Sequence, residues 1–159
     1  MTVANADFRK VLGHFATGVT VITATLPDGK RFGFTVNAFS SVSLNPPLVL
    51  VCVGNGGEAG AAMSAATHFA VNILGEDQEN ISRQFSSKVP DRFEGVAATA
   101  GASGAPILSG CIGTLECRKT SAHMEGDHSI VIGEVLSAEA SNEGQPLLYF
   151  RSGYRRVSA

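Results

Sequence analysis

The sequence predicts a mainly β fold, namely an antiparallel barrel, closed or split, with a few short helices at its periphery. Short segments rich in β-branched and apolar residues recur along the chain. Turns marked by glycine, proline or aspartate separate most of them, which favours hairpins between neighbouring strands. No Gly-x-Gly-x-x-Gly stretch follows a strand, which argues against a doubly wound nucleotide-binding fold.

The composition is that of one globular domain over residues 1–159. Hydrophobic residues make up 44% of the chain and charged residues only 16%, so we expect a partner subunit to cover part of the surface. The net charge of −2 and the lack of a Lys/Arg cluster argue against binding to nucleic acid or an anionic membrane. The N-terminus does not resemble a signal peptide, and no apolar run approaches the ~20 residues of a membrane helix. We therefore expect a soluble, cytoplasmic protein.

The three cysteines and four histidines predict no metal site, because their spacing matches no zinc-ligand pattern. Cys52, Cys111 and Cys117 lie in apolar, strand-like segments. We expect them to be buried, reduced thiols rather than parts of a disulfide framework.

The first half of the chain predicts a helix, a hairpin and a buried strand. The helix covers residues 5–15, and the hairpin joins a strand over 19–25 to a returning strand over 31–39. The segment 48–53, Leu-Val-Leu-Val-Cys-Val, is apolar on both faces. One face of such a strand lies in the barrel core, so the other needs a helix or a second subunit to cover it. This is a first argument for a dimer.

The second half predicts two more helices and a long hairpin. Helices are expected over 58–66 and 77–85, and strands over 68–74, 111–118, 129–138, 146–150 and 154–157. His123 and His128 flank the tip of the long hairpin. Residues 87–106 are glycine-rich and predict a long loop, a feature that is often functional.

A run of small polar residues ends the second strand of the first hairpin. It reads Thr-Val-Asn-Ala-Phe-Ser-Ser-Val-Ser over 35–43 and leads into Asn45-Pro46-Pro47. Hydroxyls and free backbone N–H groups at a strand end bind phosphate and sugar oxygens at low steric cost. Asn37 offers both a donor and an acceptor to the edge of a pyrimidine-like ring. By itself the run is also typical of a turn whose serines cap their own backbone.

Three further motifs carry polar groups. In Glu125-Gly126-Asp127-His128 the aspartate can orient the imidazole, which then contacts a nicotinamide or handles a proton. Tyr154-Arg155-Arg156 offers arginines to a dinucleotide pyrophosphate. Phe85-Ser86-Ser87-Lys88 offers a ring, hydroxyls and a cation to an adenylate or a phosphate. Each also has an ordinary interpretation: an exposed turn histidine, a solvated edge, and a helix end with a core phenylalanine.

Taken together, these segments change the interpretation, because the chain resembles the flavin reductase family of two-component flavin-dependent monooxygenases. Six segments match this family in order along nearly the whole chain: Phe-Ala-Thr-Gly-Val-Thr-Val at 15–21, Gly-Phe-Thr-Val-Asn-Ala-Phe-Ser-Ser-Val-Ser at 33–43, Pro-Pro-Leu-Val-Leu-Val-Cys-Val at 46–53, Phe-Ala-Val-Asn-Ile-Leu at 69–74, Gly-Asp-His at 126–128 and Pro-Leu-Leu-Tyr-Phe at 146–150. Each segment is a weak signal alone, but their common order is specific.

The resemblance implies an antiparallel split β-barrel that binds flavin near the interface of a homodimer. Such enzymes transfer a hydride from NADH or NADPH to FAD or FMN. They release the reduced flavin to a separate oxygenase that acts on an aromatic or similar substrate. The sequence shows no basic cluster for a 2′-phosphate, which favours NADH.

The resemblance also implies which residues bind the cofactor. The isoalloxazine ring would be bordered by Thr35, Val36, Asn37 and Ala38, and the ribityl and phosphate groups would contact Ser40 and Ser41. The next strand exit would contribute Cys52, Val53, Gly54 and Asn55, with Phe85 and Ser86 beyond them. The stretch 54–60 carries fewer Ser, Thr or Arg residues than the family pattern, which leaves the choice between FMN and FAD open.

The hydride donor is assigned to a different set of residues. By the same likeness, His128 would be the catalytic residue that faces the nicotinamide, and Tyr154 and Arg155 would help to hold that nucleotide. Two alternatives stay open. One is a non-catalytic flavin- or haem-binding split-barrel protein that acts as a sensor, carrier or store. The other is an oxidase of the pyridoxamine-phosphate type, although the basic phosphate cluster that it needs is absent around residues 54–66.

Overall fold

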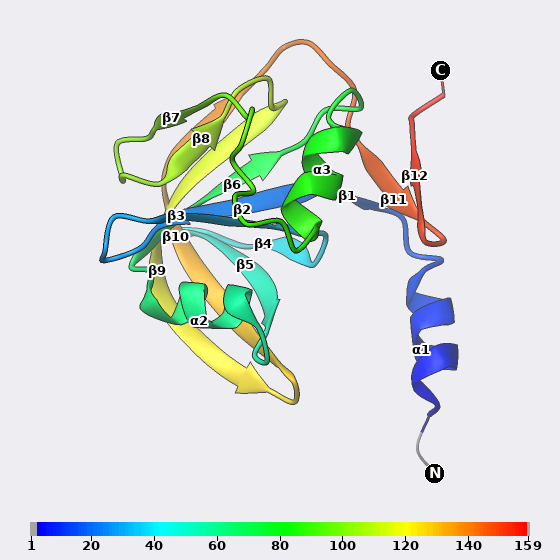
Figure 1. Ribbon diagram of the computed structural model, residues 1–159. Coiled ribbons are helices and arrows are strands. Elements are labelled where there is room, and N and C mark those ends of the chain that lie inside the picture. Colours follow the sequence, from blue (N-terminus) through cyan, green and yellow to red (C-terminus); the bar gives the residue numbers. More distant parts are fainter. Residues whose placement is uncertain (1–2, 159) are drawn as a thin grey trace.

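The structure is a computed structural model that describes residues 3–158. Strands make up far more of it than helices do, which confirms the prediction of a mainly β protein (Figure 1). Within the described residues three helices of eight residues each lie around the strands: α1 (Asn5–Leu12), α2 (Glu58–Ala65) and α3 (Glu79–Ser86). None of the described helices has the length and apolarity that crossing a membrane requires.

Seven strands form one antiparallel sheet. They are β2 (Thr20–Thr25), β3 (Arg31–Val36), β4 (Phe39–Leu44), β5 (Pro47–Gly54), β6 (His68–Ile73), β9 (Gly113–Glu125) and β10 (His128–Ala140). Their order is β3-β2-β6-β9-β10-β5-β4, and the pairs β2–β3, β4–β5 and β9–β10 are hairpins. The two hairpins predicted from the sequence, β2–β3 and β9–β10, are therefore present. The hairpin β4–β5 was not predicted.

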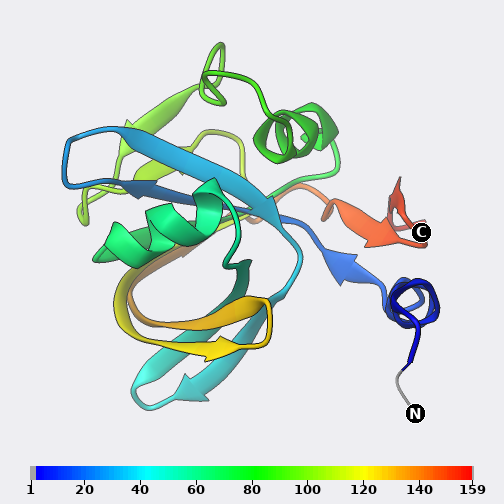
Figure 2. The ribbon, with the colours of Figure 1, turned by 60° about the horizontal axis from the view of Figure 1, so that its bottom comes forward.

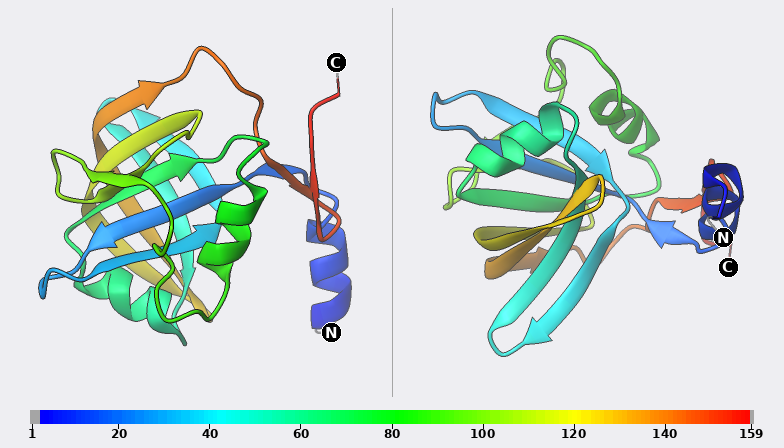
Figure 3. Two further views of the ribbon diagram at one scale, coloured as in Figure 1. Left: turned by 45° about the horizontal axis from the view of Figure 1, so that its top comes forward. Right: turned by 90° about the horizontal axis from the view of Figure 1, so that it is seen from below.

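The two edge strands of this sheet are consecutive in the chain. Only Asn37 and Ala38 separate the end of β3 from the start of β4, although the two strands lie at opposite edges. Because two residues span so short a distance, the sheet must curl until its edges meet at this connection, as the end-on view shows (Figure 3). Among the described strands no hydrogen-bonded ladder joins β3 to β4, so the sheet curls without closing.

This connection corrects the single strand predicted over 31–39. The β-like sequence runs on without a break, but Val36 pairs with Thr20 whereas Phe39 pairs with Val51. The change of partner, which is a tertiary event, divides the run into two strands.

Two smaller sheets flank the large one. The first consists of β1 (Thr17–Gly18), β11 (Leu148–Phe150) and β12 (Gly153–Arg155). The second pairs β7 (Ala98–Ala100) with β8 (Pro106–Leu108) and lies across the large sheet (Figure 2). It corrects the prediction of an irregular loop over 87–106, since strands of three residues are too short to show a clear alternation.

The core fills the inside of the curled sheet. Phe69 is fully buried there, and its ring lies so close to Gly133 that a Cβ at this glycine would come within 2.5 Å of it. Along β5 the residues alternate as predicted, with Val49, Val51 and Val53 in the core. Leu48, Leu50 and Cys52 are only half-buried on the other face of the strand.

The three cysteines are free thiols, but only two of them are well shielded. Burial raises the pKa of Cys111 to about 11 and that of Cys117 to about 12. The expectation of buried, reduced thiols therefore holds for Cys117, which is fully buried, better than for the half-buried Cys52 and Cys111.

Helix α1 stands apart from the curled sheet (Figure 1). It contributes no buried residue, and its apolar side chains are exposed: Phe8 (57%), Val11 (69%) and Leu12 (54%), followed by Phe15 (77%) beyond the helix. The helix ends at Leu12, earlier than predicted, and a turn at Gly13 then leads into β1. The four apolar side chains named here are called the α1 apolar face below.

Candidate functional site

A cavity of about 660 Å³ lies where the edges of the sheet meet. One wall comes from the β3–β4 connection and from β4 and β5, and the other from the end of α1 and from β1. The lining residues are Leu12, Phe15, Ala16, Thr17, Gly18, Thr20, Asn37, Ala38, Phe39, Ser40, Leu50, Cys52 and Ile73. The walls are largely apolar with a few polar groups, and the volume is in the usual range for small-molecule sites, roughly 300–1,000 Å³. We call it the strand-exit cavity.

Four of the residues predicted to bind the cofactor meet in this cavity: Asn37, Ala38, Ser40 and Cys52. The Asn37 amide donates to the Thr17 hydroxyl at 3.2 Å and so ties the β3–β4 connection to β1. The amide oxygen of Asn37 accepts no hydrogen bond from another described residue and remains available as an acceptor.

The neighbouring residues of the run lie around the cavity rather than in its wall. Thr35 donates its hydroxyl proton to the Ser82 carbonyl of α3 at 2.7 Å, so this proton is not free for a ligand. Val36 is half-buried against the core, and Ser41 lies exposed on β4 opposite Val49.

The end of β5 carries a second group of predicted residues. Gly54 lies opposite His128 in the sheet, and a Cβ at Gly54 would be 3.8 Å from His128 Nε2. Asn55 braces the tip of the β9–β10 hairpin, because its N–H donates to the Asp127 carbonyl at 2.9 Å and its side-chain oxygen accepts from Ser129 at 2.6 Å. The imidazole of His128 therefore lies over the exit of β5, and the histidine stands at the tip of the long hairpin, where the sequence predicted it.

Asp127 orients this imidazole. The Asp127 carboxylate accepts a hydrogen bond of 2.7 Å from His128 Nδ1, which leaves Nε2 as the outward nitrogen. The hydrogen bond and charge of His128 hold the pKa of Asp127 below its usual range, and the positive charge of Arg9 lowers it further. Since Arg9 belongs to α1, the helix lies close enough to the hairpin tip to influence it electrostatically.

Three predicted residues are engaged elsewhere. The Phe85 ring is 1% exposed and packs edge-on against Phe93 at 5.0 Å, while Gly33 makes room for it. This placement corrects the expected cofactor contact of Phe85, because a buried ring offers no surface to a ligand. The Val53 side chain is likewise 2% exposed, so only its backbone lies at the strand exit. Ser86 donates to the Arg83 carbonyl at 2.9 Å and closes the last turn of α3.

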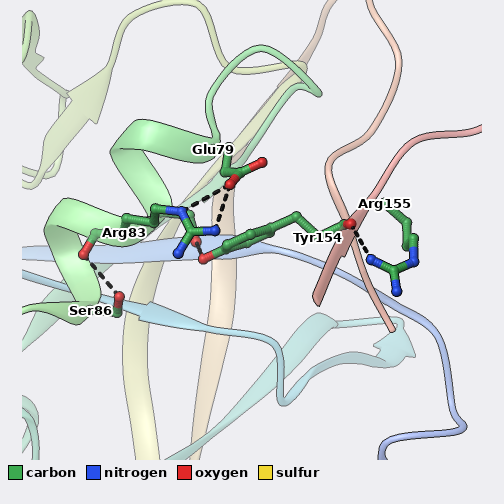
Figure 4. A network of polar contacts seen from close by, with 6 residues as sticks. Glu79, Arg83, Ser86, Tyr154 and Arg155 are labelled. Atoms are coloured by element: carbon green, nitrogen blue, oxygen red, sulfur yellow. Dashed lines mark hydrogen bonds and ion pairs between the residues drawn. The ribbon is translucent and has the colours of Figure 1, made fainter. Parts of the chain in front are cut away.

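The Tyr154 side chain points toward α3, whereas Arg155 lies on the far side of Tyr154 (Figure 4). The Tyr154 hydroxyl hydrogen-bonds to Ser82 Oγ at 2.8 Å, and the Arg83 guanidinium stands 4.8 Å from the centre of the tyrosine ring. Arg155 donates to the Tyr154 carbonyl at 2.7 Å. Within residues 3–158 no hydrogen bond or ring contact joins either of them to His128, so the structure does not bring the three predicted nucleotide-binding residues together.

The comparison with known families identifies the chain. A model of the "Flavin reductase like domain" matches residues 12–158. The chain belongs to the flavin reductase family. The sequence resemblance is thus confirmed over nearly the whole length.

Individual relatives of this flavin reductase carry related names. The FMN reductase (NADH) SmoA of Agrobacterium fabrum is 43% identical over 96% of this chain and 86% of its own length. HsaB of Rhodococcus jostii, a reductase subunit of a flavin-dependent monooxygenase, is 42% identical over 94% of this chain and 76% of its own. Among solved structures, the NADH:FAD oxidoreductase SgcE6 of Streptomyces globisporus, in complex with NAD and FAD fragments, superimposes with a TM-score of 0.92. It is 37% identical and covers 99% of this chain and 97% of its own.

The residues of the strand-exit cavity fit a flavin. The apolar walls from Phe15, Leu50 and Ile73 suit a planar ring system, and the Asn37 amide and Ser40 hydroxyl can meet its polar edges. The wall from α1 and β1, including Thr17, was not among the predicted site residues. The segment 15–21 carried the signal as one of the six matching segments, but the sequence alone indicated only a helix end there.

Proposed function

We propose that this flavin reductase transfers a hydride from NADH to FAD or FMN and supplies the reduced flavin to a separate oxygenase that acts on an aromatic or similar substrate. The observation that carries the proposal is the coincidence of two findings. The family match covers residues 12–158, and the strand-exit cavity is lined by the polar run that the family pattern assigns to flavin. An enzyme with this activity is an oxidoreductase that uses a nicotinamide nucleotide as the hydride donor and a flavin as the acceptor.

The flavin supplies the redox chemistry when it is bound, so the protein needs little acid–base chemistry of its own. Its task is to hold the flavin ring and the nicotinamide face to face at a near-attack distance of ~3–3.5 Å. We assign the ring to Asn37, Ala38 and the backbone of Val36, and the ribityl and phosphate groups to Ser40 and Ser41. To the periphery of the same ligand we assign the Cys52 side chain and the backbones of residues 53–55, together with Thr35 and Ser86.

We assign His128 to the nicotinamide nucleotide. With Nδ1 bound to Asp127, its Nε2 is the free polar atom over the exit of β5 and can hydrogen-bond to a carboxamide. The variant His128→Ala is expected to raise the KM for NADH or to slow flavin reduction, with flavin affinity nearly unchanged. His123→Ala, on the other strand of the same hairpin, is the matched control. Equal kinetics of both variants and the wild type would remove His128 from the mechanism. For Tyr154 and Arg155 the contact with the nucleotide stays a prediction.

We also propose a single split-barrel domain that works as a homodimer in the cytoplasm. The curled but unclosed sheet and the match over residues 12–158 support the fold. The α1 apolar face borders the strand-exit cavity through Leu12 and Phe15, and Leu44 at the far end of β4 is a further apolar side chain that is 95% exposed. A second subunit that buries these side chains would complete the wall of the cavity. Light scattering after gel filtration measures the mass, and a monomer at micromolar concentration would contradict the dimer.

The reaction is tested by anaerobic stopped-flow mixing of the protein with NADH and either FAD or FMN. Loss of the flavin absorbance together with NADH oxidation is expected. If neither flavin supports NADH oxidation, the reductase assignment fails. A bound chromophore that NADH does not bleach would instead favour the non-catalytic flavin- or haem-binding alternative.

A further inference from the structure

A second cavity, of about 720 Å³, takes no part in the site described above. It is a groove between the β2–β3 hairpin, helix α2 and the segment 88–93 that follows α3. In Figure 2 helix α2 lies alongside β3, which forms the floor of this groove. We call it the α2 groove.

The α2 groove is locally positive. Its lining includes four cations, Lys30, Arg31, Lys88 and Arg92, but only two carboxylates, Glu58 and Asp91. This surplus of two positive charges stands in a chain whose net charge is −2. A concave surface with a local charge opposite to that of the whole protein concentrates anions of matching shape.

Arg92 holds the three sides of the groove together. Its guanidinium donates to the Gly33 carbonyl of β3 at 3.1 Å and pairs with Glu58 of α2 at 3.3 Å, while Nε donates to the Ser87 carbonyl at 2.9 Å. Because three of the five N–H donors of Arg92 are bound by the protein, the main role of this residue is to shape the groove. The groove is thus formed in advance, which lowers the entropic cost of binding.

Three cations remain for a ligand. Lys30, Arg31 and Lys88 are exposed, and within residues 3–158 no ion pair engages any of them. Lys88 and Lys30 are point charges, whereas the Arg31 guanidinium stands 4.6 Å from the centre of the Phe93 ring. An arginine positioned in this way presents a planar, charged surface on which a base can stack.

The groove also offers a flat apolar wall. Ala61, Ala62 and Ala65 face it from α2, and the half-buried Phe32 ring lies beside them. Small side chains on one face of a helix leave room for a planar group. The lining thus pairs a planar, largely apolar slot with free cations at its rim, which is the chemistry of a purine carrying phosphates.

We propose that the α2 groove binds the adenosine diphosphate arm of a dinucleotide, the group that FAD and NADH share. This inference rests on the proposed function. Gly33 lines the groove and Asn37 lines the strand-exit cavity, so the two sites lie about 14 Å apart along the chain at ~3.4 Å per residue. A dinucleotide carries its two ring systems at opposite ends of a diphosphate and can occupy both sites.

The direct test uses ADP itself as the probe, in calorimetric titrations without turnover. ADP is expected to bind the wild type, and Lys88→Glu is expected to weaken binding at least about tenfold, since it replaces a charge-assisted contact with repulsion. Lys10→Glu is the matched control, because it makes the same charge change on the polar side of α1. If ADP does not bind, or if both variants bind it as the wild type does, the proposal is overturned.

A steric pair of variants tells the two sources of the arm apart. Ala61→Trp fills the groove from an exposed position of α2, whereas Ser64→Trp places the same ring outside the groove. If FAD supplies the arm, Ala61→Trp raises the KM for FAD about tenfold and leaves that for FMN unchanged. If NADH supplies it, the KM for NADH rises with FMN as the acceptor. Equal effects of the two tryptophans, or no effect of either, count against the groove.

This outcome is distinct from a failure of the proposed function. A protein that oxidises no NADH with either flavin still reports ADP binding in the titration. Conversely, a reductase that works with FMN but shows no ADP binding keeps its function and loses the α2 groove as a site. Thermal melting of each variant identifies any that fails to fold. If Ala61→Trp fails to fold, Lys88→Glu, which changes an exposed residue, still tests the groove.

Discussion

The curled sheet and the terminal flank of this protein differ in how they are stabilised. We define the terminal flank as α1 and β1 at one end of the chain together with β11 and β12 at the other. The sheet encloses fully buried side chains such as Phe69, Val51 and Cys117. In the flank, α1 buries nothing and exposes the α1 apolar face. The difference indicates that the sheet folds on its own contacts, whereas α1 depends on a surface outside its own chain.

The two parts of the terminal flank differ in how firmly they are anchored to the rest of the subunit. The C-terminal hairpin is anchored, because the rings of Tyr149 and Tyr154 pack edge-on against each other at 5.4 Å. Both tyrosines also pack against the core cluster that includes Phe85 and Leu147, and Tyr154 hydrogen-bonds to α3. Helix α1 is linked to the C-terminal strands mainly through the Arg151 N–H, which donates to the Gly13 carbonyl at 2.8 Å. The strand-exit cavity lies between the well-packed sheet and this weakly anchored helix, where a ligand can enter.

The largest contrast is expected from two phenylalanines. Phe69→Ala should lower the free energy of unfolding by about 3–5 kcal/mol, because the cavity next to Gly133 cannot be refilled. Phe15→Ala in the flank should cost less than about 1 kcal/mol in the isolated subunit, since the ring is 77% exposed. Urea unfolding at low protein concentration measures both. Similar losses for the two variants would show that the flank is as integral to the subunit as the sheet.

The next effect concerns assembly. Phe8→Asp places a charge in the α1 apolar face and should weaken self-association at least about thirtyfold, the effect of losing a central apolar contact. The unfolding free energy of the monomer should change little. Sedimentation equilibrium measures the association, with Lys10→Asp on the opposite side of α1 as the control. If Phe8→Asp leaves the mass unchanged, the helix is covered by something other than a second copy.

A smaller effect distinguishes Cys52, which faces the cavity between the sheet and the terminal flank, from the other two cysteines. Cys52 lines the strand-exit cavity, whereas burial raises the pKa values of Cys111 and Cys117 to about 11 and about 12. At pH 8 only about one Cys111 in a thousand is a thiolate, so iodoacetamide should modify Cys52 first. Saturating FMN should slow the modification of Cys52 several-fold, as peptide mass spectrometry can follow. Equal rates with and without FMN would place the flavin outside this cavity.

The smallest expected effect is on the stability of the β7–β8 hairpin, which lies in the region of the curled sheet. Burial alone would raise the pKa of Glu116, but hydrogen bonds from Ser103 and Ala102 outweigh it, and the pKa is lowered. A lowered folded-state pKa stabilises above the ordinary value of ~4.3, and this contribution is lost as the pH falls through the lower value. Hydrogen exchange of residues 98–108 should therefore be slower in the wild type than in Glu116→Gln at pH 6, and the difference should shrink as the pH falls below ~4.3 and Glu116 becomes protonated. A difference that persists in acid would contradict the role of the carboxylate.

Local sequence patterns predicted much of the fold. The strands of the β2–β3 and β9–β10 hairpins followed from alternation and turn residues, and β5 showed the expected buried face. The break between β3 and β4 could not be predicted, because Phe39 pairs with Val51 across the other edge of the sheet and no local signal marks that choice. The strands β7 and β8 were missed because they are too short to show a period.

The site was predicted in part, through the family resemblance. Asn37, Ala38, Ser40 and Cys52 converge in the cavity because Ser40 and Cys52 belong to the paired strands β4 and β5 and the other two residues immediately precede β4. Phe85 was misplaced because its environment depends on Gly33, a distant residue whose missing side chain leaves room for the ring in the core. Tyr154 was placed with His128 by likeness, yet a hydrogen bond to Ser82 holds it on α3.

The sequence by itself determined the mainly β class and the family, because strand period, turn residues and the order of six short segments are properties of neighbouring residues. It also placed His128 at the tip of a hairpin, whereas the pairing of β10 with β5 decided that this tip lies beside the end of β5. Only the tertiary structure decided where the cavities lie, which of the polar residues line them and that α1 remains uncovered. These features depend on contacts between residues far apart in the chain, namely the curl that brings β3 to β4 and the ties that Arg92 makes around the α2 groove.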